Sequence, residues 1–330
     1  MKRKRVAIIS ATGTAQKRTI PRIRERDICD IAGIQGRNRE KLEAVAKKYS
    51  IPYYCTDVVE LLDSVHPDFA FIGSPAFMHT DQIRLCMERR IPVLCEKPLC
   101  LSVSDGKIIE SLVRESGTEL RVAHHLRHQP AIIAVQEIIQ GGKLGRIRRA
   151  SIQWAFWVRE EASSTDWKRD PRKGGQNAFF DSGIHAIDLM LCLLPAPKRV
   201  AAVAVKSRFQ DTFDTVSAVL DCGDSIVELS TSQATRFPGN ALTIDFENGT
   251  IHIPHALSET PIERVEITSS TGTEVRTFEA HNAYGEEIAD FIRILNGEVT
   301  NATSLAEGLR GVEIIEAITN SYTTGKAIAL

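Results

Sequence analysis

Short apolar runs alternate with helical patterns over the first 125 residues of this chain, and no other feature narrows the possible folds as far. An apolar run of roughly four to eight residues is typical of a buried strand, and strands that alternate with helices predict βαβ units. We therefore predict an α/β domain built on a doubly wound parallel sheet. The predicted strands are 6–10, 28–35, 69–73, 93–96 and 119–123, with helices at 38–48 and 79–89 among those between them.

The pattern changes after residue 145, where strands follow one another with short turns between them. Turn sequences such as Asn248-Gly249 predict a large, mainly antiparallel open sheet. A helix at 179–194 is expected to cover one face of this sheet. Apolar residues recur at helical spacing in 305–322, which predicts a C-terminal amphipathic helix packed with the same domain. The predicted strands are 148–158, 199–209, 215–220, 226–232, 242–246, 250–253 and 264–268.

A length of 330 residues fits two domains, and we place the boundary between an α/β domain at 1–125 and an α+β domain at 126–330.

The net charge is −1, so neither nucleic acid nor a membrane is expected as a partner. The seven cysteines form no C-x-x-C pair, which favours thiols in a reducing compartment and hence a cytoplasmic protein. His124 and His125 would point to opposite faces of a strand, so no metal site is expected.

Two short clusters carry the residues best suited to chemistry. Lys97, in Glu96-Lys97-Pro98, ends a predicted parallel strand, and doubly wound sheets bind their ligands at the carboxyl ends of the strands. Asp181 and His185 are four residues apart, so a helix that begins there would place both on one face. A lysine, a histidine and an orienting aspartate can together move a proton on and off an alcohol oxygen. This set of residues is typical of an alcohol dehydrogenase that transfers hydride.

Together with the rest of the chain, these clusters resemble the glucose-fructose oxidoreductase / inositol dehydrogenase / MocA (Gfo/Idh/MocA) family. The resemblance implies a dinucleotide-binding Rossmann domain at 1–125 and a substrate-binding and oligomerisation domain at 126–330. The similar segments keep the family order over nearly the whole length. They are Val6-Ala7-Ile8-Ile9, Gly73-Ser74-Pro75 with His79, Glu96-Lys97-Pro98-Leu99, 122–127, 142–145, Gly174-Gly175 and the D-x-G-x-H-x-x-D motif at 181–188.

The first turn departs from the Rossmann pattern, which has glycines for the tight turn, the approach of the pyrophosphate and helix packing. Ser10, Thr12 and Ala15 occupy these positions, and only Ala15 is an expected residue. Two interpretations stay open. In one, backbone N–H groups at the start of the next helix still bind phosphate, aided by Ser10, Thr12, Gly13 and Thr14. In the other, the turn has lost the cofactor and the fold survives as a scaffold. The two chemical clusters favour the first.

The end of the second strand distinguishes the two nicotinamide cofactors. NAD enzymes usually place Asp or Glu there for the ribose 2′-hydroxyl, whereas an arginine accommodates the 2′-phosphate of NADP. This chain has Gly36-Arg37-Asn38-Arg39 and no acid at the strand end. The planar guanidinium of arginine suits phosphate. We therefore predict NADP in preference to NAD, held through Arg37 and Asn38, with Asn38 also the N-cap of the following helix.

The resemblance also implies roles for the individual site residues. Lys97 would lie near both the nicotinamide and the substrate hydroxyl, and His185 would be the base that takes the alcohol proton. Asp181 would bind the substrate or orient the imidazole. Helix capping is the alternative role for His79. Further cofactor contacts are implied for Ser74, Pro75, His79 and Glu96, and substrate contacts for Arg127 and Trp167 beside Asp181 and His185.

The implied activity is NAD(P)-dependent hydride transfer to or from a secondary alcohol or ketone of a sugar, cyclitol or nucleotide-linked sugar. Lys97 and His185 would handle the proton. Two alternatives remain: a non-catalytic cofactor-sensing or binding protein on the same fold, and an NAD-dependent glycosidase of the same family. Members of the family commonly associate through the open face of the second sheet, so a homodimer or homotetramer is expected.

Overall fold

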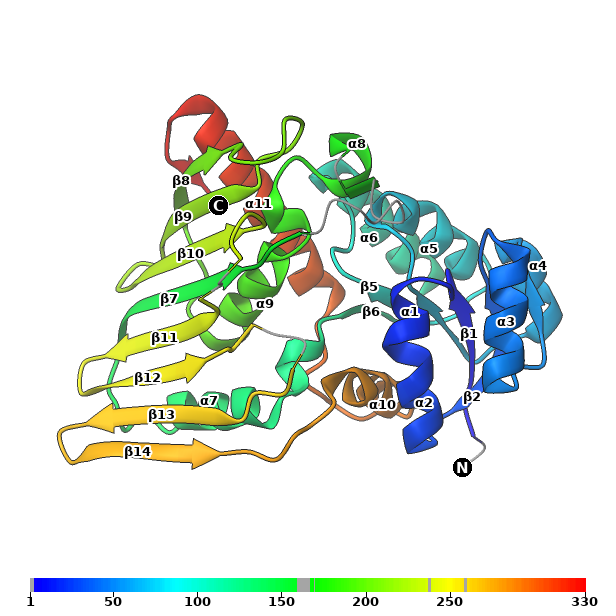
Figure 1. The fold of residues 1–330 in the computed structure, drawn as a ribbon, viewed down its shortest axis with the longest axis horizontal. Coiled ribbons are helices and arrows are strands. Elements are labelled where there is room, and N and C mark those ends of the chain that lie inside the picture. Colours follow the sequence, from blue (N-terminus) through cyan, green and yellow to red (C-terminus); the bar gives the residue numbers. More distant parts are fainter. Residues whose placement is uncertain (1–2, 159–166, 169, 237–238, 258–259) are drawn as a thin grey trace. The chain divides into compact units, whose positions relative to one another are not determined.

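The computed structural model describes residues 3–158, 167–168, 170–236, 239–257 and 260–330 (Figure 1). The chain divides into two compact units. The N-terminal unit comprises the residues up to His125 together with Asn282–Leu309, and the C-terminal unit comprises Leu126–His281 with Arg310–Leu330. Each unit contains one sheet.

The N-terminal unit contains a six-stranded parallel sheet in the order β3-β2-β1-β4-β5-β6. The order reverses between β1 and β4, which makes the sheet doubly wound and confirms the predicted fold class. The strand β3 was not predicted because it is only two residues long. The strands are β1 Arg5–Ile9, β2 Asp30–Gln35, β3 Tyr54–Cys55, β4 Phe69–Ile72, β5 Val93–Glu96 and β6 Leu120–Ala123.

Helices cover both faces of this sheet. Helices α2, α3 and α10 share one buried cluster with the side chains of β1, β2 and β4, while α4, α5 and α6 contact one another in turn. The predicted N-cap of α3 is confirmed, because Asn38 Oδ1 accepts a hydrogen bond from the Lys41 N–H at 2.9 Å. The helices are α1 Thr14–Lys17, α2 Thr19–Arg26, α3 Arg39–Tyr49, α4 Val58–Val65, η1 Ala76–Met78, α5 His79–Glu88, α6 Val103–Ser116 and α10 Ala283–Leu295.

By its contacts the segment 282–309 groups with the N-terminal unit, whereas the division drawn from the sequence placed it in the second domain. Helix α10 buries Ile288 and Phe291 in the core of the first sheet, and the ring of Phe291 meets that of Phe69 at 5.5 Å between centroids. Periodicity shows that a helix has an apolar face but not which distant sheet receives it. The final helix, α11 Leu305–Thr324, begins in the N-terminal unit and continues into the C-terminal unit from Arg310.

The C-terminal unit contains a nine-stranded sheet in the order β14-β13-β12-β11-β7-β10-β9-β8-β15. Only β7 and β10 pair in parallel, so the prediction of a mainly antiparallel sheet is confirmed. The strand β14 was not predicted because all its residues are exposed and no apolar alternation marks it. The strands are β7 Ile147–Ala155, β8 Arg199–Val205, β9 Thr215–Asp221, β10 Ile226–Ser232, β11 Ala241–Phe246, β12 Gly249–Pro254, β13 Arg264–Ser269, β14 Gly272–Thr277 and β15 Ile328–Ala329.

Helix α9 packs against β7 and β10, on one face of the nine-stranded sheet (Figure 1). The predicted helix at 179–194 is therefore present, but as two pieces, η4 and α9. The opposite face presents alternate residues of β8 and β9 to the surface, among them Val203 and Val219. The helices of this unit are η2 His125–His128, which begins at the unit boundary, α7 Pro130–Gln140, α8 Pro171–Gly174, η4 Ala178–Phe180 and α9 Gly183–Leu193.

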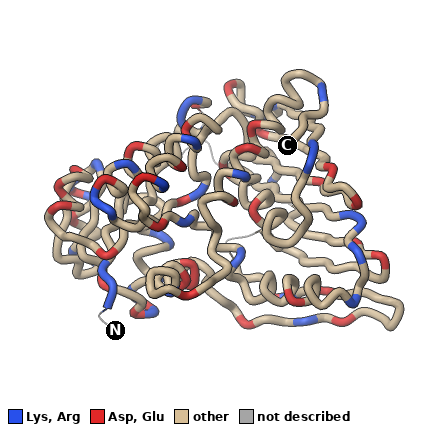
Figure 2. The backbone as a smooth tube through the Cα atoms, turned by 180° about the vertical axis from the view of Figure 1, so that it is seen from behind, with Lys and Arg blue, Asp and Glu red and all other residues tan. Residues whose placement is uncertain are grey.

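Basic and acidic residues are interspersed along the described chain (Figure 2). No helix in the described ranges combines the length and apolar character that a membrane span requires. Likewise, no three His, Cys, Asp or Glu side chains among the described residues are grouped so as to hold a metal ion.

Candidate active site

Lys97 directly follows β5, at the carboxyl edge of the first sheet. The register pairs Ile72 of β4 with Cys95, and Glu96 with Ala123 of β6, so the ends of these three strands meet at one edge. The Glu96 side chain is 9% exposed, and its Oε2 accepts a hydrogen bond from the Lys97 backbone N–H at 3.2 Å. The Glu96 carboxylate therefore fixes the backbone that carries the candidate catalytic amine.

His79 joins two loops at this edge. Its side chain is fully buried, Nε2 lies 2.8 Å from the Ser74 carbonyl oxygen, and Nδ1 lies 3.1 Å from the carbonyls of Pro98 and Leu99. Burial lowers the pKa of His79, against the opposing effect of these carbonyls. Both ring nitrogens thus face backbone oxygens, and the cofactor contact of His79 stays a prediction.

Ser74 and Pro75 lie at the start of the loop that His79 holds. The Ser74 hydroxyl is buried and donates to Gln82 Oε1 at 2.6 Å, and Pro75 precedes η1. These contacts give the loop after β4 a defined conformation beside the Lys97 segment. Their contact with a cofactor stays a prediction.

The first turn keeps the backbone conformation of a glycine turn although a serine occupies it. Ser10 has φ of 61°, in the left-handed region that favours glycine. Its N–H donates to Gln35 Oε1 at 3.1 Å, and Gln35 Nε2 donates in turn to the Thr56 carbonyl at 2.9 Å. The buried Gln35 side chain thus holds the turn in this conformation, a role that the sequence did not indicate.

The rest of the turn also fits a dinucleotide. A Cβ placed on Gly13 would meet no atom within 4 Å, so the space above the turn is open. Ala15 is fully buried, and its Cβ lies 3.3 Å from the position that a Cβ on Gly73 would take, which matches the close helix packing required at the third position. Thr12 and Thr14 are half-buried beside this space. The residues present therefore fit a bound nicotinamide dinucleotide.

Arg37 lies just beyond β2, one residue after Gly36. Its side chain is exposed, and no carboxylate among the described residues forms an ion pair with it. Asn38 is also exposed, but its side-chain oxygen already caps α3. At the strand end the residue best suited to bind an anion is therefore Arg37, and the cofactor contact of Asn38 stays a prediction.

In the C-terminal unit, His185 lies in the first turn of α9. The side chain is 4% exposed, and its ring centroid lies 4.7 Å from that of Trp154 on β7. Helix α9 begins at Gly183, so Asp181 precedes the helix instead of sharing a face with His185. A Cβ on Gly183 would lie 2.3 Å from the Phe179 ring, which explains the glycine in the D-x-G-x-H motif.

Two residues that sequence reasoning missed hold Asp181. Lys168 Nζ forms an ion pair with Asp181 Oδ1 at 2.7 Å, and Gln233 Nε2 donates to Oδ2 at 3.1 Å. The Lys168 ammonium also lies 5.8 Å from the centroid of the Trp167 ring. Lys168 and Gln233 lie 13 and 52 residues from Asp181 in the sequence, and no local motif links them to it.

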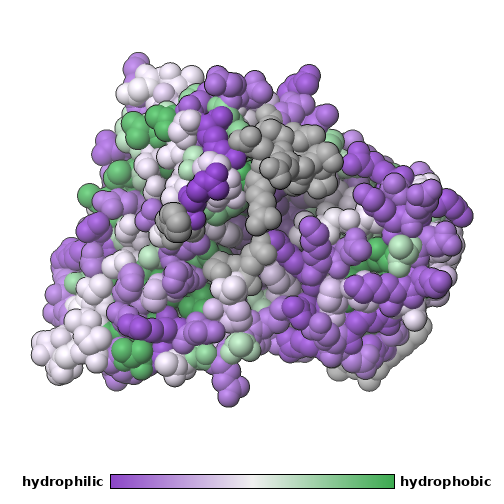
Figure 3. Space-filling view, in the orientation of Figure 1, coloured by the Kyte–Doolittle hydropathy of each residue, from purple (hydrophilic) through white to green (hydrophobic). Residues whose placement is uncertain are grey.

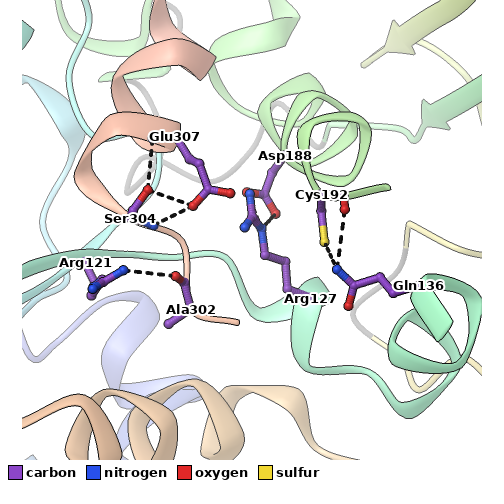
Figure 4. Close-up of polar contacts among 8 residues, drawn as sticks. All are labelled: Arg121, Arg127, Gln136, Asp188, Cys192, Ala302, Ser304 and Glu307. Atoms are coloured by element: carbon purple, nitrogen blue, oxygen red, sulfur yellow. Dashed lines mark hydrogen bonds and ion pairs between the residues drawn. The ribbon is translucent and has the colours of Figure 1, made fainter. Parts of the chain in front are cut away.

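Arg127 and Asp188 form a buried ion pair. Their side chains are 2% and 3% exposed, Arg127 Nε lies 2.9 Å from Asp188 Oδ1, and a second guanidinium nitrogen lies 2.8 Å from the same oxygen. Figure 4 shows this pair beside the contact of Gln136 with Cys192; the first joins α9 to η2 and the second joins α9 to α7. The guanidinium of Arg127 thus fixes α9, and its substrate contact stays a prediction.

The structure therefore groups the predicted residues within each unit. The N-terminal unit holds the first turn, Arg37, Ser74, Glu96 and Lys97, and the C-terminal unit holds Trp167, Asp181 and His185. The first group can bind a dinucleotide and present an amine. The second presents an imidazole and a carboxylate held by a lysine.

Comparisons with known proteins identify the family of the chain. Residues 4–124 match the family model described as an oxidoreductase family with an NAD-binding Rossmann fold, and residues 132–252 match the Gfo/Idh/MocA C-terminal domain. The D-xylose 1-dehydrogenase (NADP(+)) 2 of Haloferax volcanii is 25% identical over 325 residues, which cover 98% of either chain.

Two solved structures have the same fold. The aldose-aldose oxidoreductase of Caulobacter crescentus, complexed with glycerol, is 20% identical over the full length of both chains, with a TM-score of 0.90. The WlbA dehydrogenase of Bordetella pertussis, in complex with NADH and UDP-GlcNAcA, is 20% identical over 100% of this chain and 99% of its own, with a TM-score of 0.87. Because the two family models together match most of its length, the chain belongs to the Gfo/Idh/MocA family of oxidoreductases with an NAD(P)-binding Rossmann fold.

Proposed function

We propose that this protein is an NAD(P)-dependent oxidoreductase that interconverts a secondary alcohol and a ketone of a sugar, cyclitol or nucleotide-linked sugar. The observation that carries the proposal is the presence, in one unit, of a glycine-like first turn and of Lys97 at the carboxyl edge of the same sheet. The relative from Haloferax volcanii is named for D-xylose, and the WlbA structure contains UDP-GlcNAcA. Both names support a carbohydrate substrate.

The chemistry divides between the cofactor and the protein. A bound nicotinamide supplies the carbon that exchanges hydride with the alcohol carbon. Lys97 and His185 handle the proton that leaves the alcohol oxygen during oxidation and that returns to it during reduction. Lys168 forms an ion pair with Asp181, and in this proposal the Asp181 carboxylate orients the substrate or the imidazole.

The first experiment is a titration of the purified protein with NADPH and NADH, followed by nicotinamide fluorescence. Saturable binding supports the proposal and is followed by turnover assays with sugar alcohols and ketoses. Binding without turnover of any sugar would favour the non-catalytic cofactor sensor. Glycoside cleavage with no net change in the cofactor would favour the glycosidase. No binding of either dinucleotide would overturn the proposal.

NADP is the proposed cofactor, and Arg37 is proposed to bind its 2′-phosphate. Replacing Arg37 with alanine is expected to weaken NADPH binding about 10- to 100-fold, because a charged hydrogen bond contributes roughly 1.5–3 kcal/mol. NADH lacks the 2′-phosphate, so its dissociation constant is expected to stay within about twofold. Fluorescence titration of both cofactors measures the two effects.

Lys47→Ala is the matched control for Arg37, because Lys47 is exposed in the last turn of α3, the helix that follows Arg37. It is expected to leave both dissociation constants unchanged. Equal weakening of NADPH and NADH by Arg37→Ala would show that Arg37 does not recognise the 2′-phosphate.

We also propose that the protein forms a homodimer or homotetramer through the open face of the nine-stranded sheet. Val203 and Val219 are 71% and 48% exposed on this face, and hydrophobic residues interleave with hydrophilic ones where the strands reach the surface (Figure 3). Val203→Asp is expected to dissociate the oligomer in sedimentation velocity, because burial of an unpaired carboxylate in an interface is unfavourable.

Val299→Asp is the control for this prediction, since Val299 is fully exposed in the N-terminal unit. It should leave the sedimentation coefficient unchanged. A wild-type protein that sediments as a monomer at micromolar concentration would rule out the proposed association.

A reducing compartment such as the cytoplasm is proposed from the cysteines. All seven are free thiols, and all but Cys192 are buried. Burial raises the pKa of the Cys95 thiol well above its ordinary value, which keeps the thiol protonated and unreactive.

A further inference from the structure

Glu287 is a buried carboxyl group that interacts electrostatically with Glu96, the residue before Lys97. It lies on the inner face of α10, where its side chain is 3% exposed, one turn after Tyr284. The ring of Tyr284 stacks on that of His125 with centroids 4.1 Å apart, and the Arg18 guanidinium lies 5.4 Å from the centre of the Tyr284 ring. All of these residues belong to the N-terminal unit.

Helix α10 carries the acids Glu286, Glu287 and Asp290, and Asp and Glu are red in Figure 2. Glu287 differs from the other two in its partners. Glu286 forms an ion pair with Arg26, and Asp290 pairs with Arg293. No ion pair joins Glu287 to a cation within the described part of the chain, and its buried Oε2 has no hydrogen-bond partner there. An ionised carboxylate in this position would be poorly compensated.

Burial and neighbouring charges both act on the pKa of Glu287. Burial raises the pKa of Glu287 well above its ordinary value of 4.5, and the negative charge of Glu96 raises it further, while Arg18 opposes both. Glu96 accepts a hydrogen bond from the Lys97 N–H. Burial also raises the pKa of Tyr284, so this phenol stays neutral. The charged groups that act on Glu287 are thus Glu96 and Arg18, and Glu287 in turn raises the pKa of Tyr284, on which His125 stacks.

We propose that Glu287 is a positioning residue for Lys97: it stays protonated at neutral pH, so that the Glu96–Glu287 pair carries a single negative charge. Ionisation of Glu287 would add a second negative charge beside Lys97 and favour the ammonium form of the lysine. An ammonium cannot accept the alcohol proton. The protonated state of Glu287 therefore extends the pH range over which Lys97 exchanges a proton, and this inference rests on the proposed function.

The test uses Glu287→Gln, which keeps the size of the side chain and is neutral at every pH. At pH 7 the variant is expected to oxidise substrate within about twofold of the wild-type rate, because glutamine reproduces the neutral state. In the wild type, turnover should fall at alkaline pH as Glu287 ionises. In the variant this fall is expected to move up by at least about one pH unit.

Glu286→Gln is the matched control, since Glu286 is the neighbouring acid and faces Arg26. Its pH profile is expected to coincide with that of the wild type. A profile of Glu287→Gln that also coincides with the wild type would overturn the proposal, as would a loss of turnover at every pH in a folded Glu287→Gln protein.

A second measurement does not depend on activity. Infrared spectra of the wild type at pH 7 are expected to contain a protonated-carboxyl band that is absent from Glu287→Gln, and an ionised Glu287 at this pH would overturn the proposal. If the protein binds neither NADPH nor NADH, the proposed function fails even though this band is present. If it binds and turns over but Glu287 is ionised, only the positioning role fails.

Thermodynamic linkage gives a third readout. A carboxyl whose pKa is raised by folding contributes stability below its unfolded pKa, near 4.5, and that contribution is lost as the pH rises toward the folded pKa. Across this window the unfolding constant of the wild type is expected to rise relative to that of Glu287→Gln by up to about tenfold per pH unit. A ratio independent of pH would contradict a neutral Glu287.

Discussion

Replacing Lys97 with methionine is expected to lower turnover about 10²- to 10⁴-fold, the usual range for the loss of a group that transfers a proton. Methionine keeps an unbranched chain of similar length but has no amine. The backbone of residue 97 is held by Glu96 through its N–H, a contact that the substitution leaves in place. Cofactor affinity is therefore expected to stay within about twofold of the wild type. Steady-state kinetics and NADPH titration measure the two quantities.

The control for Lys97 is Lys107→Met, which removes an exposed lysine from α6 in the same unit. Its turnover and NADPH affinity are expected to match those of the wild type. Normal turnover in Lys97→Met would contradict the catalytic assignment. A parallel loss of NADPH affinity would instead make Lys97 a cofactor-binding residue.

Asp188→Ala is expected to lower the free energy of unfolding by roughly 3–5 kcal/mol, because it leaves the Arg127 guanidinium buried without its partner charge. Both side chains are almost fully buried, and two guanidinium nitrogens contact the carboxylate. Water cannot replace the carboxylate without opening the space between α9 and the segment that carries Arg127. Urea unfolding followed by circular dichroism measures the loss as a shift of the midpoint at unchanged slope.

Two further variants test whether the loss of stability comes from an unpaired buried charge and not from the loss of any ion pair. The double variant Arg127→Met/Asp188→Leu removes both charges and is expected to be more stable than Asp188→Ala, since no unpaired charge is left in the core. Arg172→Ala breaks the ion pair with Asp170 at the surface and is expected to leave the midpoint unchanged. A midpoint of Asp188→Ala equal to that of the wild type would show that Arg127 finds another partner.

Local patterns were sufficient for much of the fold. The apolar runs near 6–10, 69–73 and 93–96 appear as β1, β4 and β5, and alternation over 215–220 and 226–232 appears as β9 and β10. These predictions succeeded because side-chain burial in a strand or helix repeats with the geometry of that element. Lys97 was placed at a strand end by the same argument.

Such local patterns could not predict the polar contacts of the site. Gln35 holds the first turn, His79 joins two loops, and Lys168 with Gln233 holds Asp181. Each of these contacts joins residues that are distant in the sequence or follow no periodic spacing. Asp181 and His185 were expected on one helical face, but α9 begins at Gly183, two residues after Asp181.

The chain alone thus indicates its two sheets, its strand ends, the cap of α3 and the residue types of a hydride-transferring site, because each follows from local periodicity or from a short motif. Tertiary packing assigns α10 to the first sheet, holds Ser10 in a left-handed conformation and buries Glu287 near Glu96. These features depend on which distant surfaces meet. In the unfolded chain a glutamate carboxyl has its ordinary pKa. Only the burial and the charged neighbours that folding supplies change that pKa.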